Sequence, residues 1–184
     1  MGKVSRLKSV KSSVKPAYKL DFGCGPHPRE GFTGVDSRDF GQPITHDLTT
    51  VWPWENESVL EAHASHFIEH LTAPQRIHFC NELYRVLVPG GTCQIIVPHW
   101  ASCRAYGDLT HQWPPVSEFW FYYLSEAWRK DNAPHNDGYR CNFAATWGYS
   151  LHPLVQPRNT EYQQTAIQFY KEAAQDMIAT LTKA

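Results

Sequence analysis

The feature that most restricts the fold is a succession of short apolar segments over the first hundred residues, each followed by turn or helix signals. In the first segment Tyr18, Leu20 and Phe22 alternate with polar residues before a glycine turn, which is typical of a strand. The last segment is largely apolar, as in a strand buried on both faces of a parallel sheet. Strands that alternate with helical segments predict an α/β layered fold. We expect strands over residues 17–22, 32–36, 43–48, 58–65 and 92–98.

One helix is clearly marked before the last of these strands. Thr72 and Gln75 form a capping box, and Pro74 fits the first turn, where a missing N–H donor costs nothing. The sequence PGG at residues 89–91 is expected to end the helix. Its buried face is predicted from apolar residues at helical spacing, namely Ile77, Cys80, Leu83, Tyr84 and Leu87.

The chain after Pro98 is rich in aromatic residues and in proline-containing turns. We expect a helix from about Ser117 to Lys130 and a strand within residues 141–150. An amphipathic helix is predicted over residues 160–182, because apolar side chains recur there at helical spacing. The residues of that face are Ala166, Tyr170, Ala173, Met177 and Leu181.

Length and charge limit what the chain can be. With 184 residues, 42% of them hydrophobic, it can bury one core, so we expect a single domain over residues 16–184. The 17 basic and 18 acidic residues nearly cancel, which leaves no overall field to attract nucleic acid or an anionic membrane. Residues 1–15 carry only positive charges and are expected to form a flexible basic tail. An arm that contacts an anionic partner such as nucleic acid is the alternative.

Cysteine usage and hydropathy predict the compartment. Five cysteines without a C-x-x-C pair argue against a disulfide framework and favour reduced thiols. No apolar stretch is long enough for a signal peptide or a membrane span. We therefore expect a cytoplasmic protein.

The glycine turn after the first strand is a candidate ligand site. Gly23 and Gly25 remove the Cβ atoms that would keep a ligand away from the backbone. Asp36 ends the second strand, where nucleotide-binding α/β folds place an acid that accepts hydrogen bonds from a ribose. The third glycine of the dinucleotide fingerprint is replaced by Pro28, which disfavours a nicotinamide or flavin enzyme.

Taken together, these motifs resemble those of class I S-adenosylmethionine-dependent methyltransferases. The matching segments are LDFGCGP, GVD, HDL, ASHFIEHL, NELYRVLVPGG and IIVPH, in this order, within residues 17–100. They are most similar to the type-11-like group. In addition, GDLTHQ at residues 107–112 is similar to the GDPTH that follows the fifth strand in compact bacterial and phage-encoded members.

The resemblance implies a Rossmann-like sheet with helices on both faces and an aromatic-rich C-terminal part. Residues 16–100 would bind the cofactor, and residues 101–184 would form an acceptor or lid region that ends in a C-terminal helix. Only ten residues separate Gly25 from Asp36, so the first crossover helix is expected to be reduced to a loop.

The resemblance also implies S-adenosylmethionine as the cofactor, with in-line methyl transfer to an acceptor that the sequence does not identify. Such a transfer depends mainly on alignment. The resemblance places Asp21, Gly23, Cys24 and Gly25 beside the methionine and ribose parts of the cofactor. Asp36 would accept hydrogen bonds from the ribose hydroxyls, Asp47 and Leu48 would flank the adenine, and Ser65 and His66 would lie beside the sulfonium.

A general base is needed only if the acceptor must lose a proton. The candidates near the carboxyl ends of strands are His66, Glu69, His70, Asp108 and His111. His66 and His111 rank first, since a neutral imidazole near pH 7 suits proton transfer. Transfer without any base stays open, and so does an accessory protein that binds the cofactor without turnover.

Residues 66–70, HFIEH, also have the H-x-x-E-H order with which an inverted zincin holds zinc on a helix. That arrangement requires His66 and His70 on one helical face, with Glu69 as the general base and a third ligand downstream. A chain with 10 histidines can match three fixed positions by chance. A zinc hydrolase is therefore a remote alternative, and we expect no metal ligands.

The acceptor is the least constrained part of the prediction. The aromatic stretch over residues 114–128 is expected either to form an acceptor pocket or lid, or to be core that compensates for a shortened sheet. No NPPY-type motif for adenine N6 methylation is present, and Cys103 lacks the partner cysteine that pyrimidine C5 chemistry would need. The sequence indicates no oligomeric state.

Overall fold

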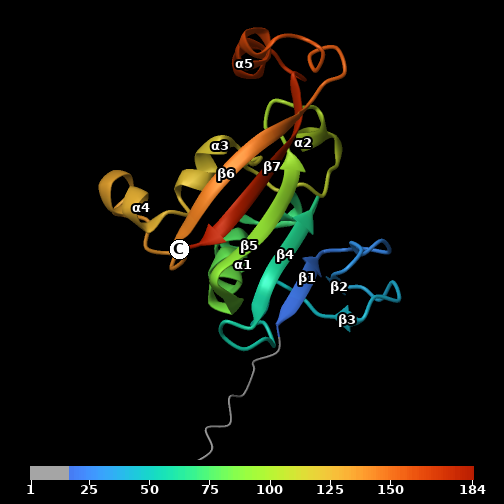
Figure 1. Ribbon diagram of the computed structural model, residues 1–184, viewed down its shortest axis with the longest axis vertical. Helices are drawn as coiled ribbons and strands as arrows, with labels where there is room; N and C mark the ends of the chain where they lie inside the picture. The colour runs from blue at the N-terminus through green and yellow to red at the C-terminus, as the bar shows by residue number, and fades with distance from the viewer. Residues whose placement is uncertain (1–16) are drawn as a thin grey trace, which may run out of the picture.

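A computed structural model describes residues 17–184, so the predicted basic tail over residues 1–15 lies outside the described residues. The chain forms one seven-stranded sheet, drawn in Figure 1. Its strands, in spatial order, are β3 (Ile44–Thr45), β2 (Thr33–Asp36), β1 (Tyr18–Phe22), β4 (Val59–Ser65), β5 (Leu87–Pro98), β7 (Ala174–Lys183) and β6 (Phe143–Leu151). The helices are η1 (Ile68–His70), α1 (Ala73–Val86), α2 (Arg104–Gly107), α3 (Glu118–Tyr122), α4 (Glu126–Asn132) and α5 (Thr160–Phe169).

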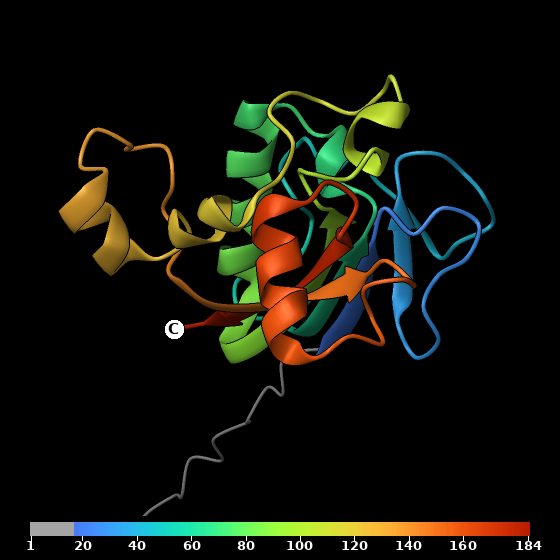
Figure 2. The same ribbon diagram turned by 90° about the horizontal axis from the view of Figure 1, so that it is seen from above.

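The strands from β3 to β5 are parallel to one another, and β7 is antiparallel to both β5 and β6. This arrangement confirms the predicted α/β class. All carboxyl ends of the parallel strands therefore meet at one edge of the sheet, the edge that faces the viewer in Figure 2. The chain leaves β1 toward β2 on one side and later enters β4 on the other, so this edge contains a topological switch point.

The two faces of the sheet differ in chemistry. On the first face, Phe22 contacts Phe79 of α1, and Trp147 of β6 stacks on Phe121 of α3 with ring centroids 5.4 Å apart. Burial of such apolar and aromatic area is the main favourable term in folding. The strand residues on this face include Leu20, Ala62, Ala64, Cys93, Ile95, Val97, Met177, Ala179 and Leu181, all of them buried.

The second face, which Figure 1 shows in front of α1 and α3, carries mainly polar pairs. The crossovers from β1 to β2, from β2 to β3 and from β3 to β4 contain no helix, so the reduction of the first crossover helix is confirmed and extends further than predicted. Helices were expected on both faces of the sheet. Near β1 the second face has a loop instead, so the two faces are not equally covered by helices. The pairs on the second face are Lys19 with Glu61, Asp21 with His63, and Arg29 with Gln94.

Helix α1 begins at the predicted capping box, where Gln75 Oε1 accepts from the Thr72 N–H at 2.9 Å. The helix ends at Val86, before the PGG sequence, and β5 starts at once with Leu87. Pro89 explains the early stop, because a residue before proline is disfavoured in helical conformation. Residues 89–91 instead lie within β5, where the register against β4 shifts and Gly90 takes a φ of +75°.

The predicted helix over residues 160–182 is wrong beyond Phe169, because residues 174–183 form strand β7. Met177, Ala179 and Leu181 alternate with the β-branched residues Ile178 and Thr180, and this period of two matches a strand between two neighbours. The helical spacing from Ala166 to Leu181 joins residues of helix α5 to residues of strand β7 and arises by chance.

Between β5 and α5 the structure differs from the prediction in its helices, and α2 was not predicted. The predicted helix over residues 117–130 is two helices, α3 and α4, separated at Ser125, whose side chain accepts from the Trp128 N–H. The predicted strand within residues 141–150 is confirmed as β6. No helix among residues 17–184 is both long and apolar enough to cross a bilayer.

Candidate functional site

A cavity of about 200 Å³ lies at the edge where the parallel strands end, beside the switch point between β1 and β4. Open α/β sheets bind ligands at this place, because the loops that leave neighbouring strands diverge there. The cavity takes residues that directly follow β1, β2 and β3, together with residues around η1. Its lining is Gly23, Ser37, His46, Asp47, Leu48, Thr49, Phe67, His70, Leu71 and Gln75.

Gly23 occupies the sharpest point of the glycine turn. Its φ is +66°, and a Cβ atom at this position would overlap the ring of Phe67. The N–H groups of Gly23 and Cys24 both donate to the Val35 carbonyl oxygen, at 2.8 and 3.3 Å, which holds the turn against β2. Glycine is therefore required here by conformation and by the close approach of Phe67.

Asp21 is buried on the second face of the sheet. One carboxylate oxygen accepts from His63 Nδ1 at 2.7 Å, and the other accepts from the Arg29 N–H at 2.7 Å. These bonds fasten the loop after β1 to β4. Both carboxylate oxygens thus hold either backbone or a neighbouring ring.

Asp36 also holds the glycine turn. Its Oδ2 accepts from the Gly25 N–H at 3.0 Å, and its Oδ1 accepts from the Arg38 N–H at 3.0 Å. Asp36 does not line the 200 Å³ cavity, although each oxygen keeps a second lone pair. Its assignment to a ribose therefore stays a prediction.

His46 is a cavity residue that sequence reasoning missed. Its Nε2 atom is buried and has no hydrogen-bond partner among residues 17–184. A buried polar atom without a partner is costly, which makes it a candidate for contact with a ligand. The available signal was its place directly after β3, at the same edge as the glycine turn.

The predicted cofactor residues separate into two groups. Gly23, Asp47 and Leu48 line the cavity. Hydrogen bonds from the Thr49 side chain and N–H lower the pKa of Asp47, so this carboxylate stays ionised. The residues outside the cavity lining are Asp21, Cys24, Gly25, Asp36, Ser65 and His66.

All five predicted catalytic residues lie in one group, which we call the histidine cluster: His66, Glu69, His70, Asp108 and His111. One ligand atom from each of Glu69, His70 and His111 lies within 4.8 Å of the other two. His66 Nδ1 donates to Glu69 Oε1 at 3.2 Å. Asp108 joins through Thr110, whose hydroxyl oxygen lies 2.7 Å from Asp108 Oδ1 and 2.9 Å from His70 Nδ1. Residues about 40 positions apart in the chain thus form one polar site.

His66 precedes η1 with a φ of +51°, in the left-handed region. The hydrogen bond to Glu69 raises the pKa of His66, although partial burial opposes the rise. Because η1 is a three-residue 3₁₀ turn and His66 lies outside it, His66 and His70 do not share a helical face. The inverted-zincin arrangement, the remote alternative for residues 66–70, is therefore wrong.

Asp108 is exposed and supports a turn. Its Oδ1 accepts from both the N–H and the hydroxyl of Thr110, and these bonds lower its pKa. A carboxylate held in this way is a weak base. Its visible role is to orient Thr110 toward His70.

Arg76, which sequence reasoning also missed, connects the two segments that carry the histidine cluster, η1 and the segment after α2. It is 5% exposed, and its guanidinium donates to the carbonyl oxygens of Ile68 and Gln112 at 3.1 and 3.0 Å and of Pro114 at 2.6 Å. A longer bond of 3.4 Å reaches the Glu69 carbonyl oxygen. The rigid guanidinium fork can serve several acceptors at once. The sequence shows only an arginine on a helix, with no sign of its acceptors.

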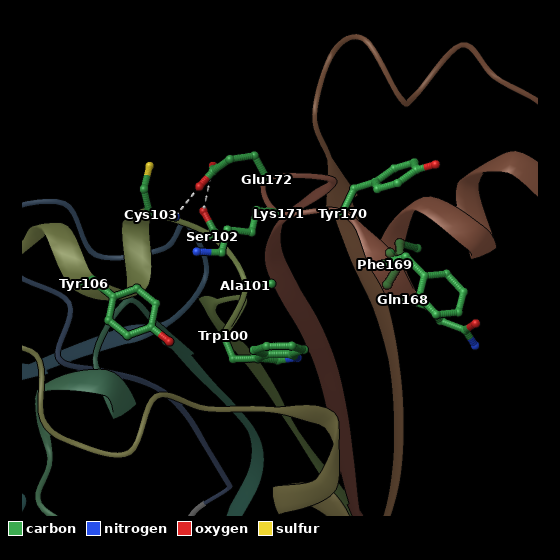
Figure 3. Close-up of a pocket in the computed structure, with 11 residues that line it drawn as sticks. Trp100, Ala101, Ser102, Cys103, Tyr106, Gln168, Phe169, Tyr170, Lys171 and Glu172 are labelled. Atoms are coloured by element: carbon green, nitrogen blue, oxygen red, sulfur yellow. Dashed lines mark hydrogen bonds between the residues drawn. The ribbon is translucent and has the colours of Figure 1, made fainter.

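A larger cavity of about 490 Å³ lies between the segment after β5 and the α5–β7 turn, as Figure 3 shows. Trp100, Tyr106, Phe169 and Tyr170 give it an aromatic lining. At one side Glu172 accepts hydrogen bonds from the Cys103 N–H and the Ser102 hydroxyl. The 114–128 stretch contributes Val116, Phe121 and Leu124 to the core. It also lines a separate cavity of about 400 Å³ with Pro115, Phe119 and Trp120, so both predicted roles stay open.

Comparisons with known proteins agree on the fold. No family model matches the chain, and no curated protein matches it in sequence. Among solved structures, an S-adenosylmethionine-dependent methyltransferase from Archaeoglobus fulgidus is 15% identical, with a TM-score of 0.64 over 91% of this chain and 86% of that one. The chain has the fold of a class I methyltransferase.

Two further structures share this fold. Geranyl diphosphate C-methyltransferase from Streptomyces coelicolor A3(2), in complex with Mg²⁺, geranyl diphosphate and S-adenosylhomocysteine, is 14% identical, with a TM-score of 0.54 over 92% of this chain and 74% of that one. The cyclase SpnF is 15% identical, with a TM-score of 0.53 over 92% of this chain and 76% of that one. The resemblance seen in the sequence is confirmed for the fold, while the bacterial or phage-encoded origin stays a prediction.

Proposed function

We propose that the protein is an S-adenosylmethionine-dependent methyltransferase. The observation that carries this proposal is the cavity at the switch point of a sheet with the class I methyltransferase strand order, with Gly23 at its wall and the orphaned His46 Nε2 beside it. Solved structures with this fold include an S-adenosylmethionine-dependent methyltransferase and a C-methyltransferase in complex with S-adenosylhomocysteine. A methyltransferase function therefore agrees with both site and fold.

The cavity residues fit the polar nucleoside end of such a cofactor. His46 Nε2 is available for one hydrogen bond to the ligand, and the glycine turn lets it approach the backbone. At about 200 Å³ the cavity is smaller than the roughly 300–1,000 Å³ of usual ligand pockets. Phe67 covers Gly23, so we expect its ring to move when the whole cofactor binds. The bound cofactor would supply a methyl group already activated by its sulfonium.

The histidine cluster supplies the groups for a proton transfer beside this cavity, since His70 belongs to both. His66 is the base that we propose. Glu69 orients its ring through Nδ1, which is the arrangement of a base and its orienting carboxylate. For the acceptor we propose the aromatic cavity of Figure 3, which begins just after β5.

Calorimetric titration with S-adenosylmethionine and S-adenosylhomocysteine tests the proposal. We expect saturable binding that weakens about tenfold in His46→Phe, because one buried hydrogen bond to the ligand is lost. His135→Phe is the matched control, since His135 is exposed and outside the cavity lining. Absence of binding to the wild-type chain would refute the proposal.

A second candidate is a protein that binds the cofactor without transferring its methyl group. The cyclase SpnF has the same fold, which shows that this fold alone does not specify methyl transfer. Transfer of a labelled methyl group to any acceptor in a fractionated cell extract would exclude this candidate. Binding of the cofactor without any transfer in the same screen would favour it.

We also propose a reducing compartment such as the cytoplasm. All five cysteines are free thiols, which agrees with an environment that keeps them reduced. Localisation of a tagged full-length chain by fluorescence microscopy, together with thiol labelling in intact cells, would test this.

A further inference from the structure

Three side chains of the histidine cluster have the composition of a metal site. Glu69 and His70 come from η1, and His111 comes from the segment after α2. The backbones of the two segments are joined by a bond of 2.8 Å from the Gln112 N–H to the Glu69 carbonyl oxygen. The rings of His70 and His111 lie edge to face, with centroids 4.8 Å apart. The three groups are therefore held together by the fold itself.

Glu69 contributes a carboxylate oxygen that lacks a partner. The residue is 4% exposed, and its Oε1 accepts from His66, but no donor among residues 17–184 reaches its Oε2. A buried carboxylate oxygen without a hydrogen bond is unfavourable, and pairing it with a cation removes that cost. The nearby Arg76 does not serve this oxygen, because its guanidinium donates to backbone carbonyls.

His70 and His111 each have one ring nitrogen committed and one free. The Thr110 hydroxyl donates to Asp108, so its oxygen accepts from the Nδ1–H of His70. His111 Nδ1 lies 3.2 Å from the Ala105 carbonyl oxygen, which can only accept, so this nitrogen also carries the proton. Both neutral rings are thus in the tautomer that leaves the Nε2 lone pair available. Such contacts behind a histidine are the usual support of a metal ligand.

We propose that Glu69 Oε2, His70 Nε2 and His111 Nε2 bind a divalent transition-metal ion. Two imidazole nitrogens and one carboxylate suit Zn²⁺, Co²⁺, Mn²⁺ or Fe²⁺ better than Mg²⁺ or Ca²⁺, which prefer oxygen ligands. Bonds of about 2.0–2.1 Å would bring the three atoms to about 3.3 Å from one another. One ligand atom of each side chain already lies within 4.8 Å of the other two, so binding requires only a short approach. The proposal replaces the sequence expectation that the chain has no metal ligands.

The position of the site indicates a use for the ion. His70 lines the 200 Å³ cavity, whereas His111 and Asp108 line a separate cavity that shares Tyr106 with the large one of Figure 3. Three protein ligands leave at least one coordination position for another group. Resting on the proposed function, this position would take an oxygen of the acceptor, which favours hydroxyl or carboxylate acceptors over carbon ones.

Metal binding is measured on the full chain after treatment with a chelator and in the absence of S-adenosylmethionine. Co²⁺ is titrated while its visible absorption is followed, and Zn²⁺ is measured by equilibrium dialysis. We expect one ion per chain, affinity at least 100-fold lower in Glu69→Gln and His111→Ala, and 10–100-fold lower in Thr110→Val, which removes the support of His70. His135→Ala is the matched control and should bind as the wild type does.

The proposal is overturned if the wild-type chain binds neither ion at one per chain, or if binding survives both Glu69→Gln and His111→Ala. Circular dichroism shows whether each variant folds, and His111→Gln replaces His111→Ala if the latter does not. Because no cofactor is present, the result is independent of the proposed function. A chain that binds Co²⁺ but not S-adenosylmethionine would retain the metal site and lose the methyltransferase assignment.

Discussion

The glycine turn and the histidine cluster lie at the same edge of the sheet, yet their polar groups are used differently. Around the turn, Asp21 and Asp36 give all four carboxylate oxygens to hydrogen bonds with backbone N–H groups or a histidine. In the histidine cluster, Glu69 Oε2 has no donor in the described part of the chain, and His70 and His111 each keep a free lone pair. The carboxylates around the glycine turn stabilise the fold, whereas the histidine cluster keeps polar atoms that are free to bind a ligand.

An acidic residue at a strand end can therefore have either of two roles, to stabilise the local backbone or to bind a ligand. An aspartate beside a glycine turn can serve the turn itself, as Asp36 does by accepting from Gly25. A carboxylate that stays unpaired when buried, as in Glu69, points to a ligand. Substitutions in the two regions should therefore affect stability and binding in different proportions.

The largest effect is expected for Arg76→Met, which removes the donor to three carbonyl groups at 2.6–3.1 Å. Buried carbonyls without a partner should lower the free energy of unfolding by about 3 kcal/mol. Urea denaturation measures this loss, with the exposed Arg140→Met as control. A loss below about 1 kcal/mol would show that the histidine cluster does not depend on this arginine.

A smaller loss is expected for Gly23→Ala than for Arg76→Met, at about 2–3 kcal/mol. The new Cβ would overlap Phe67, and the φ of +66° is unfavourable for alanine. Gly25→Ala is the matched comparison, because its φ is +54° but no atom lies within 4 Å of the added Cβ, so about 1 kcal/mol is expected. Equal losses at the two glycines would show that Phe67 does not pack as described.

Asp36→Ala is expected to cost about 1–2 kcal/mol of stability, since the N–H groups of Gly25 and Arg38 lose their acceptor. Asp36→Asn keeps one acceptor oxygen and should cost about half as much. Stability is measured by urea denaturation, and cofactor affinity by calorimetry on the same samples. A variant that keeps full stability but loses affinity would make Asp36 a ligand group and erase the contrast with Glu69.

The smallest effect concerns pH. The hydrogen bond to Glu69 raises the folded pKa of His66 above its unfolded value of about 6.5, so this stabilisation is fully present below that value and is lost as pH rises through the folded pKa. The side chain is 47% exposed, so the contribution should stay below about 0.5 kcal/mol. Urea midpoints at pH 5.5 and 8.5 should differ less in His66→Gln than in the wild type. An identical pH dependence would contradict the His66–Glu69 contact.

Much of the sheet and helix α1 was predictable, because the local sequence patterns of these segments agree with the structure that they adopt. The alternation at Tyr18, Leu20 and Phe22 and the capping box at Thr72 both appear where predicted. Strand β7 was missed because it starts at Ala174, only a few residues after helix α5. The apolar residues of the helix and of the strand together happen to follow one helical spacing. Pattern alone cannot separate two such elements without a clear break between them.

Within the site, residue types were predictable but their partners were not. The five residues of the histidine cluster could be proposed one by one from strand ends and from the H-x-x-E-H order. Arg76 joins the two segments that carry them, through acceptors at Gln112 and Pro114 that lie 36 and 38 positions away. His46 could not be singled out, since only the folded cavity shows that its Nε2 lacks a partner.

The contacts of Arg76 have a consequence for sequence variation. This side chain recognises only main-chain oxygens, at Ile68, Gln112 and Pro114, and carbonyl oxygens are the same for every amino acid. The side chains of residues 112–114 can therefore change while these residues stay attached to Arg76. Libraries that randomise residues 112–114 and leave Arg76 intact should keep the histidine cluster assembled.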